Sequence, residues 1–156
     1  MINTNWSELK LNRTQLGMFG ECYAKMEFIS HKYEVYTSFV DDHGVDFVAK
    51  NPNTGEFFEV QVKGVLKSNY IYIRKDKLYP HENKLVCVLI FVDGEPPKMY
   101  IIPATAWKSP NSLLASYAYD KKGQKSKPEW GIRLSKRNES LLEEYHAEKF
   151  FEKHSL

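Results

Sequence analysis

The stretch from residue 44 to residue 63 constrains the fold more than any other part of the chain. Two runs rich in β-branched and aromatic residues, 44–50 and 56–63, flank the turn-forming sequence Asn-Pro-Asn-Thr-Gly. This pattern predicts a β-hairpin. Because side chains alternate across a strand, Gln61 and Lys63 share one face of the second run, whereas Val60 and Val62 share the other.

The polar face of this hairpin has two interpretations. If Asp46 of the first run faces the same side as Gln61 and Lys63, a carboxylate, an amide oxygen and an ammonium group come together. That grouping can hold a hard divalent cation and polarise a phosphate beside it. The alternative is a half-exposed strand with one face in water, which is common in antiparallel sheets. Two glycines, Gly44 before Asp46 and Gly64 after Lys63, favour the first interpretation.

A helix from about residue 15 to residue 30, capped by Thr14, is predicted upstream of the hairpin. Apolar residues lie on most of its sides, and such helices are buried. Its carboxylate Glu21 is either a site residue or half of an exposed i,i+4 pair with Lys25.

Together, these residues resemble the motif of the PD-(D/E)xK nuclease superfamily. The superfamily pattern is a helix Glu, a strand Asp, and Glu-x-Lys or Gln-x-Lys on the next strand. Here Glu21, Asp46 and Gln61-Val62-Lys63 match it. The Gln-x-Lys form is similar to Mrr-type restriction nucleases and to an intron-encoded homing endonuclease subgroup. The sequence departs from the pattern because no Pro precedes Asp46 and because Gln61 replaces the middle acidic residue.

The resemblance implies an endonuclease that hydrolyses DNA phosphodiester bonds with Mg²⁺ or Mn²⁺ as cofactor. It implies that Asp46 and Gln61 bind the metal and that Lys63 orients the attacking water or neutralises charge on the phosphoryl oxygens. Glu21 would complete the catalytic set by holding a metal-bound water or a second ion.

Two further residues and two other functions stay open at this stage. Glu59 lies on the face of Gln61 and could supply the missing negative charge, and His43 could act as a ligand or a proton carrier. The alternative function is a non-catalytic nuclease-fold protein that binds nucleic acid or a protein partner. A third possible function is that of an unrelated α/β interaction module, in which the polar face of the strand is exposed to solvent and has no catalytic role.

The remaining segments predict an α/β fold. Strands are expected at 33–39, 70–74, 84–92 and 98–102, and the apolar run 84–92 is expected to be buried on both faces. A turn at 64–69, helical turns within 76–83, 103–107 and 112–118, and a helix from about 138 to 153 complete the order. This order predicts an α/β fold with a mixed central sheet flanked by helices. The resemblance to the nuclease superfamily implies that this fold is restriction-endonuclease-like.

Basic residues cluster between positions 121 and 137. Because basic loops with nearby aromatic residues suit phosphate contacts and base stacking, this segment is expected to bind nucleic acid. The residues expected to do so are Lys121, Lys122, Lys125, Lys127 and Arg133. The alternative is a solvated loop. The net charge is only +2, because the acidic C-terminal segment offsets the basic one.

Length and composition favour one nuclease-like domain over residues 1–156, with a lead-in at 1–13, a core at 14–103, and the basic loop and C-terminal helix at 104–156. The two cysteines lack C-x-x-C spacing, which gives no support to a zinc ribbon. No run approaches the ~18 apolar residues of a membrane span, so a cytoplasmic protein that does not bind a membrane is expected. DNA is its expected partner. Because one site cuts one strand, a homo-oligomer, either a dimer or a tetramer, is also expected.

Overall fold

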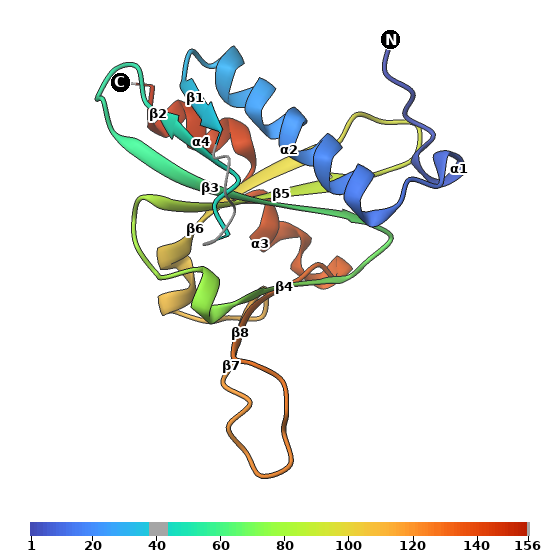
Figure 1. Cartoon of the computed structure of the whole chain (residues 1–156), viewed down its shortest axis with the longest axis vertical. Coiled ribbons are helices and arrows are strands. Elements are labelled where there is room, and N and C mark those ends of the chain that lie inside the picture. The colour runs from blue at the N-terminus through green and yellow to red at the C-terminus, as the bar shows by residue number, and fades with distance from the viewer. Residues whose placement is uncertain (38–43, 156) are drawn as a thin grey trace.

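The computed structural model describes residues 1–37 and 44–155 (Figure 1). Its helices are α1 (Trp6–Leu9), α2 (Arg13–Ser30), α3 (Glu139–Glu143) and α4 (Ala147–Lys153), with short 3-10 turns at Lys75–Lys77, Ala104–Lys108 and Lys136–Asn138. Its strands are β1 (Glu34–Thr37), β2 (Phe47–Lys50), β3 (Phe57–Leu66), β4 (Tyr70–Arg74), β5 (Lys84–Phe91), β6 (Lys98–Pro103), β7 (Leu114–Tyr117) and β8 (Glu129–Arg133).

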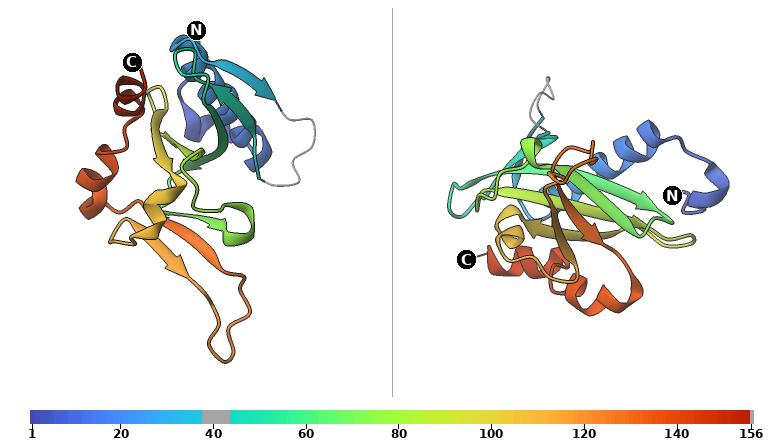
Figure 2. Two further views of the ribbon diagram at one scale, coloured as in Figure 1. Left: turned by 90° about the vertical axis from the view of Figure 1, so that its left-hand side faces the viewer. Right: turned by 90° about the horizontal axis from the view of Figure 1, so that it is seen from below.

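Two sheets organise these elements. The larger sheet has the order β1-β2-β3-β5-β6, and all its neighbours are antiparallel except β3 and β5, which run parallel. The smaller sheet has the order β4-β8-β7 and is antiparallel. The expectation of a mixed central sheet is therefore confirmed. One face of that sheet carries α2 and α4, and the other faces the smaller sheet and α3 (Figure 2).

Strand β5 divides the core into two clusters, because its alternate side chains point to opposite faces. Leu85, Cys87 and Leu89 pack in one cluster with residues of α2 and α4. Val86 and Val88 pack in the other cluster with residues of the smaller sheet. The prediction that this run is buried on both faces is confirmed.

Helix α2 starts earlier and is less buried than expected. Asn12, not Thr14, is its cap: the Asn12 side chain accepts from the Gln15 N–H, and the Gln15 side chain accepts from the Asn12 N–H. This reciprocal pair satisfies two donors at the helix start. One face of the helix packs on the sheet through Ala24 and Phe28.

The opposite face of α2 is open. Its side chains Met18, Cys22, Met26 and Ile29 are exposed, so the prediction of a helix buried on most sides is wrong. The larger sheet covers only one side of α2, so the side chains on its other side stay exposed (Figure 1).

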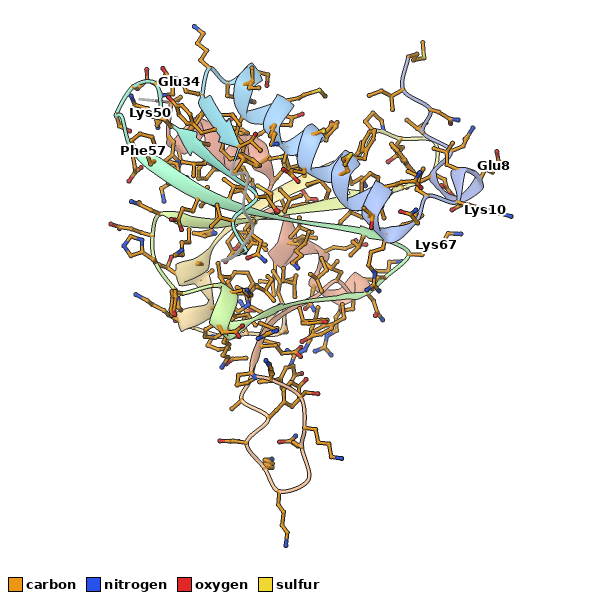
Figure 3. All side chains as sticks on the ribbon, viewed as in Figure 1. Glu8, Lys10, Glu34, Lys50, Phe57 and Lys67 are labelled. Atoms are coloured by element: carbon orange, nitrogen blue, oxygen red, sulfur yellow. The ribbon has the colours of Figure 1, made fainter. Side chains whose placement is uncertain are left out.

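The predicted hairpin forms, but its second strand is longer than expected. Strands β2 and β3 pair antiparallel, with Phe47 opposite Val60. Strand β3 continues through Gly64 to Leu66 and pairs with β5 along its length, so the turn predicted at 64–69 begins later. Figure 3 labels Phe57, the first residue of β3, and Lys67, which directly follows its last residue. At Gly64 an added Cβ would lie 3.1 Å from the Phe91 ring, which explains the small residue.

The C-terminal third differs most from expectation. The helical turn predicted at 112–118 is instead β7, because this segment forms ladder hydrogen bonds with β8. The single helix predicted for 138–153 is two helices, α3 and α4. The chain breaks between them because the edge of β6 pairs with it there: the Ile101 N–H donates to the Tyr145 oxygen at 2.8 Å, and Tyr100 forms a bridge with His146.

The N-terminal lead-in packs against its own chain. Trp6 of α1 is buried among Phe19 and Phe91, and its indole N–H donates to the Glu95 oxygen at 3.0 Å. Among the described helices, none combines the length and apolarity that a membrane crossing requires.

Candidate active site

Asp46 lies where the main chain enters β2. Its own N–H donates to the Val60 oxygen at 2.9 Å, and one carboxylate oxygen accepts from the Val62 N–H at 2.7 Å. The carboxylate is therefore fixed against the main chain of the Gln61–Lys63 segment. Gly44, two residues earlier, has φ of +77°, a conformation that non-glycine residues rarely adopt.

Gln61 and Lys63 lie on the face of β3 that points away from α2. Val60 and Val62, on the opposite face, pack in the cluster beneath that helix. Both polar side chains line a groove of about 640 Å³ between β3, β4 and the first turn of α2. The structure thus places Asp46, just before β2, against the main chain of the Gln61–Lys63 segment, while the lining of the groove includes Gln61 and Lys63 but not Asp46.

Glu21 has a different position. It lies on α2 directly after Gly20, which faces the Val62 side chain, so it is level with this part of β3. Its carboxylate forms an ion pair with Lys25 at 3.0 Å. It does not line the groove, and the pairing with Lys25, the alternative left open by the sequence, is what the described structure shows.

The two further candidates separate clearly. Glu59 forms an ion pair with Lys84 of the neighbouring strand, so its charge is already balanced. His43 lies outside the described residues.

The chemistry of the oxygen donors fits a hard divalent cation with few protein ligands. The Gln61 Oε1 atom is buried, and among the described residues it has no hydrogen-bond partner. An unpaired buried acceptor costs free energy, and a cation could satisfy it. The described residues hold no group of three His, Cys, Asp or Glu side chains suited to a metal. A cation held by Asp46 and Gln61 would therefore need water or a phosphate to complete its shell.

The walls of the groove are more basic than the sequence alone suggested. Besides Lys63, three basic side chains line it: Arg13, Arg74 and Lys77. Arg74 also pairs with Asp76, and that pairing lowers the pKa of the Asp76 carboxyl. These residues were missed because they come from two segments far apart in the sequence, the start of α2 and the end of β4 with the turn that follows it. For Arg74, the sequence did offer a signal: alternation within 70–74 puts Tyr70, Tyr72 and Arg74 on one face of the predicted strand.

The basic segment has two parts. Lys121, Lys122, Lys125 and Lys127 lie exposed in the loop that joins β7 to β8, and this hairpin projects away from the rest of the protein (Figure 2). Arg133 lies apart from them on β8. Its guanidinium donates to the Tyr117 hydroxyl at 2.6 Å and to the Asn111 oxygen at 3.3 Å, so it is fixed in place.

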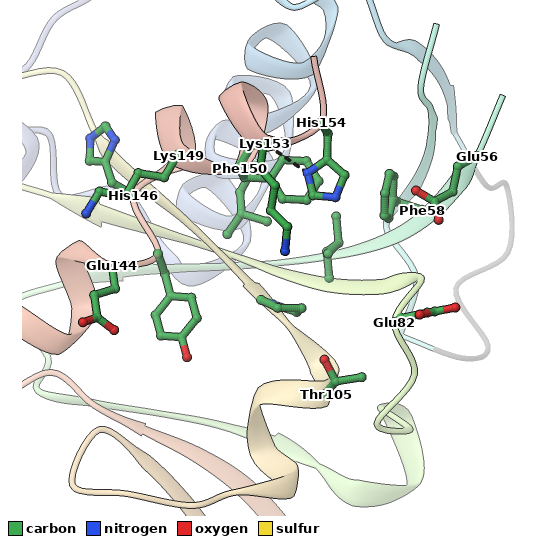
Figure 4. Close-up of a pocket in the computed structure, with 14 residues that line it drawn as sticks. Glu56, Phe58, Glu82, Thr105, Glu144, His146, Lys149, Phe150, Lys153 and His154 are labelled. Carbon is green, nitrogen blue, oxygen red and sulfur yellow. Dashed lines mark hydrogen bonds between the residues drawn. The ribbon is translucent and has the colours of Figure 1, made fainter. Parts of the chain in front are cut away.

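A second cavity, of about 490 Å³, lies beside α4 and shares no lining residue with the groove (Figure 4). Its walls mix acidic and basic side chains, among them Glu56, Glu82, Lys149 and Lys153. The His154 ring stacks on Phe150, with ring centroids 4.2 Å apart. Because opposite charges are interspersed, this cavity is a poorer phosphate site than the groove.

Comparison with known proteins supports the fold that the sequence predicted. No protein-family model and no curated protein matches the sequence. Among solved structures, the chain is similar to Hjc, a Holliday junction resolvase from Archaeoglobus fulgidus, with a TM-score of 0.56 and 14% identity over 87% of this chain and 95% of that one. It is also similar to the bacterial homing endonuclease I-Ssp6803I, with a TM-score of 0.54 and 16% identity over 92% of this chain and 94% of that one.

Both of these proteins are nucleases, and each matches nearly its whole length to this chain. The mixed sheet and the flanking helices are shared with them, which confirms the expected fold class. At 14% and 16% identity, this likeness concerns the fold: the chain has the nuclease-like fold that the sequence predicted.

Proposed function

We propose that the protein is a metal-dependent endonuclease that hydrolyses phosphodiester bonds of DNA. The observation that carries the proposal is the hydrogen bond from the Val62 N–H to the Asp46 carboxylate. This bond fixes Asp46 beside Gln61 and Lys63, and those two side chains line one groove. The two nuclease neighbours support the same reaction class.

Each site residue has a role in the proposal. Asp46 and Gln61 would hold Mg²⁺ or Mn²⁺, which supplies Lewis-acid polarisation of the phosphate and a more acidic water. The Lys63 ammonium would donate to an oxygen of the scissile phosphate. It would stabilise negative charge there while the bond from water to phosphorus forms and the bond to the leaving oxygen breaks. Glu21 would have to leave Lys25 to contribute, so we assign it a supporting role at the site.

The basic side chains would hold the DNA. Arg13, Arg74 and Lys77 line the groove beside Lys63 and would contact phosphates next to the scissile one. The lysines of the β7–β8 hairpin would contact the backbone farther along. These contacts carry affinity and salt dependence but no sequence information.

We also infer that residues 1–156 act as one nuclease-like domain and as a homo-oligomer. The two core clusters share strands β5 and β6, which argues for a single cooperative unit. The exposed apolar side chains Met18, Cys22, Met26 and Ile29 form one stripe along α2. A two-fold contact between two such helices would cover this stripe and provide the second site that cutting both strands needs.

One observation favours the alternative, a non-catalytic protein with this fold that binds nucleic acid. Gln61 is neutral and Glu21 is paired with Lys25, so Asp46 is the carboxylate that remains assigned to the metal. A site with so little negative charge binds Mg²⁺ weakly in the absence of substrate.

A nicking assay on supercoiled plasmid separates the two functions. The endonuclease predicts open-circular product with Mg²⁺ or Mn²⁺, and none with EDTA or with the Asp46→Asn variant. Glu59→Gln is the matched control, because Glu59 lies on the same face of β3 but is paired with Lys84. Plasmid retarded in a gel but never nicked, under any of these conditions, would support the binding protein instead.

A further inference from the structure

A third cavity, of about 540 Å³, lies at the base of the β7–β8 hairpin and has no role in the proposed cleavage. Aromatic and basic side chains line it, namely Tyr70, Tyr117, Tyr119, Arg133 and Arg137. The acid that lies close to it is Glu129, which is buried. Its carboxylate accepts a hydrogen bond from the Tyr70 hydroxyl at 2.5 Å, so the Tyr70 side chain lies between this negative charge and the cavity.

The tyrosines form a fixed stacking surface. The rings of Tyr117 and Tyr119 lie 5.5 Å apart between centroids, at an interplanar angle of 18°. The Arg133 guanidinium lies 5.6 Å from the Tyr117 centroid and donates to its hydroxyl. Stacked tyrosines flanked by a guanidinium are the side chains on which an unpaired base stacks, because every base offers a π-face.

Two features show that this surface is held in a particular conformation. Tyr119 has φ of +50°, which is uncommon and costly for a residue with a side chain. At Gly131, directly beneath Tyr70, an added Cβ would lie 2.2 Å from the tyrosine hydroxyl, so only glycine allows the Tyr70 ring to lie flat across β8. Strain of this kind gathers at ligand sites, where the surrounding structure maintains it.

The cavity also adjoins the groove of the candidate active site. Tyr70 lines both of them, and the neighbouring residues divide between them, with Ser68 in the groove and Asn69 in the cavity. The segment that joins them is rigid, because the Leu134 N–H donates to the Asn69 oxygen at 2.7 Å and extends the β4–β8 ladder. One DNA strand can therefore cross from the groove to the cavity without leaving the protein surface.

We propose that this cavity binds a single unpaired nucleotide of the DNA, next to the phosphate held in the groove. The base would stack on Tyr117 and Tyr119, and its phosphate would contact Arg137, which is exposed; none of the described residues that line the cavity is acidic. In a continuous duplex both faces of every base are already stacked, so the surface has nothing to bind. The preferred DNA would therefore carry an unpaired base, as at a bulge, a branch or a flipped position. This inference rests on the proposed function, which supplies DNA as the partner.

The test compares two short duplexes that differ by one unpaired 2-aminopurine nucleotide, with binding measured by anisotropy in EDTA so that neither is cut. The wild type is expected to bind the bulged duplex about five- to a hundredfold more tightly, the range that stacking of one base on aromatic side chains gives. The fluorescence of 2-aminopurine should fall on binding as the base stacks. Equal affinities for the two duplexes in the wild type would overturn the inference without any variant.

Variants locate the effect. Tyr117→Leu with Tyr119→Leu keeps apolar bulk but removes the π-faces, and it should remove most of the preference for the bulge. Arg137→Gln changes an exposed residue and should reduce it in part. Tyr79→Leu is the matched control, because Tyr79 is exposed and lies outside the cavity. A preference that survives in the double variant, or an equal loss in Tyr79→Leu, contradicts the assignment.

Cleavage is measured separately, so the two ideas can fail independently. A wild type that nicks plasmid with Mg²⁺ but binds both duplexes equally retains the endonuclease and loses the nucleotide site. A wild type that prefers the bulge but never nicks DNA retains the nucleotide site and loses the endonuclease. Tighter binding of the matching single-stranded RNA than of the bulged DNA would contradict the choice of DNA.

Discussion

Replacing Gln61 by methionine should raise the stability of the metal-free protein and strongly reduce the further stabilisation that Mn²⁺ gives. The Gln61 Oε1 atom is buried and has no hydrogen-bond partner among the described residues, which costs about 1–3 kcal/mol relative to a satisfied acceptor. Methionine has the same length and no polar atom. Apolar neighbours are available, since Leu78 and Leu85 lie with Gln61 around the same small cavity.

The magnitude follows from two opposing terms. Removing the unpaired acceptor contributes about 1–3 kcal/mol, and losing an ordinary hydrogen bond of the amide nitrogen would cost about 0.5–1.5 kcal/mol. The expected net gain is about 1 kcal/mol, which corresponds to a rise in Tm of about 2–4 °C for a chain of this size.

Mn²⁺ should reverse the ranking of the two proteins, so that the wild type becomes more stable than Gln61→Met. If Gln61 is a ligand, Mn²⁺ at ten times its Kd stabilises the wild type by about 1.4 kcal/mol, because only the folded state binds it. Gln61→Met should gain much less. Gln61→Glu should gain more than the wild type, since a second carboxylate binds the ion more strongly, although it will be less stable in EDTA with two acids side by side. Calorimetric titration of Mn²⁺ without DNA should rank the three proteins in the same order.

The assay is thermal unfolding of the three proteins in EDTA and in a series of Mn²⁺ concentrations, with Glu59→Gln as control. Two results would refute the reasoning. One is a Gln61→Met variant less stable than the wild type in EDTA, which would mean that Oε1 is not a free-energy cost. The other is an equal Mn²⁺ response in Gln61→Met and the wild type, which would mean that Gln61 does not bind the ion.

Four other changes test the remaining parts of the site and the fold. Lys63→Ala should lower the nicking rate about 10²–10³-fold with DNA binding retained, whereas Lys67→Ala, just beyond the end of β3, should leave it unchanged. Replacing the four lysines of the β7–β8 loop by Ala should flatten the salt dependence of DNA binding by up to about one unit of slope for each phosphate that the loop no longer neutralises; an unchanged slope would mean a merely solvated loop. Met26→Glu should dissociate the oligomer in sedimentation, and an already monomeric wild type would contradict the α2 interface. Hydrogen bonds from the side chain and main chain of Ser7 lower the pKa of Asp93, so their stabilisation is present above about pH 4 and lost on further acidification. Protection of the Trp6 indole N–H from hydrogen exchange, measured relative to its intrinsic rate at each pH, should then fall, and in Asp93→Asn the protection should be the same above and below this pH.

The sequence determined the elements whose signals are local. Alternation along 56–63 placed Gln61 and Lys63 on one face and Val60 and Val62 on the other, since the side-chain period of a strand is fixed at two. The apolar run 84–92 required a strand covered on both sides. The motif residues also predicted a nuclease-like fold, which the comparison with solved structures bears out.

Helix burial and chain breaks were not local properties. The apolar sides of α2 indicated burial, but one sheet covers only one side of a helix, so Met18 and Met26 remain exposed. The C-terminal helical pattern was interrupted at Tyr145 and His146 because the edge of β6 offered hydrogen-bond partners from a distant part of the chain. A competing partner of this kind leaves no trace in the segment that it interrupts.

The surfaces that would meet DNA were decided by tertiary structure alone. Arg13, Lys63 and Arg74 line one groove only because β3 pairs in parallel with β5 and the chain between them, carrying β4, passes over the sheet. The tyrosine cavity likewise depends on β4, β7 and β8 pairing in that order. Alternation fixes which side chains share a face of one strand, but which faces meet depends on pairings between residues far apart in sequence, and no local pattern encodes them.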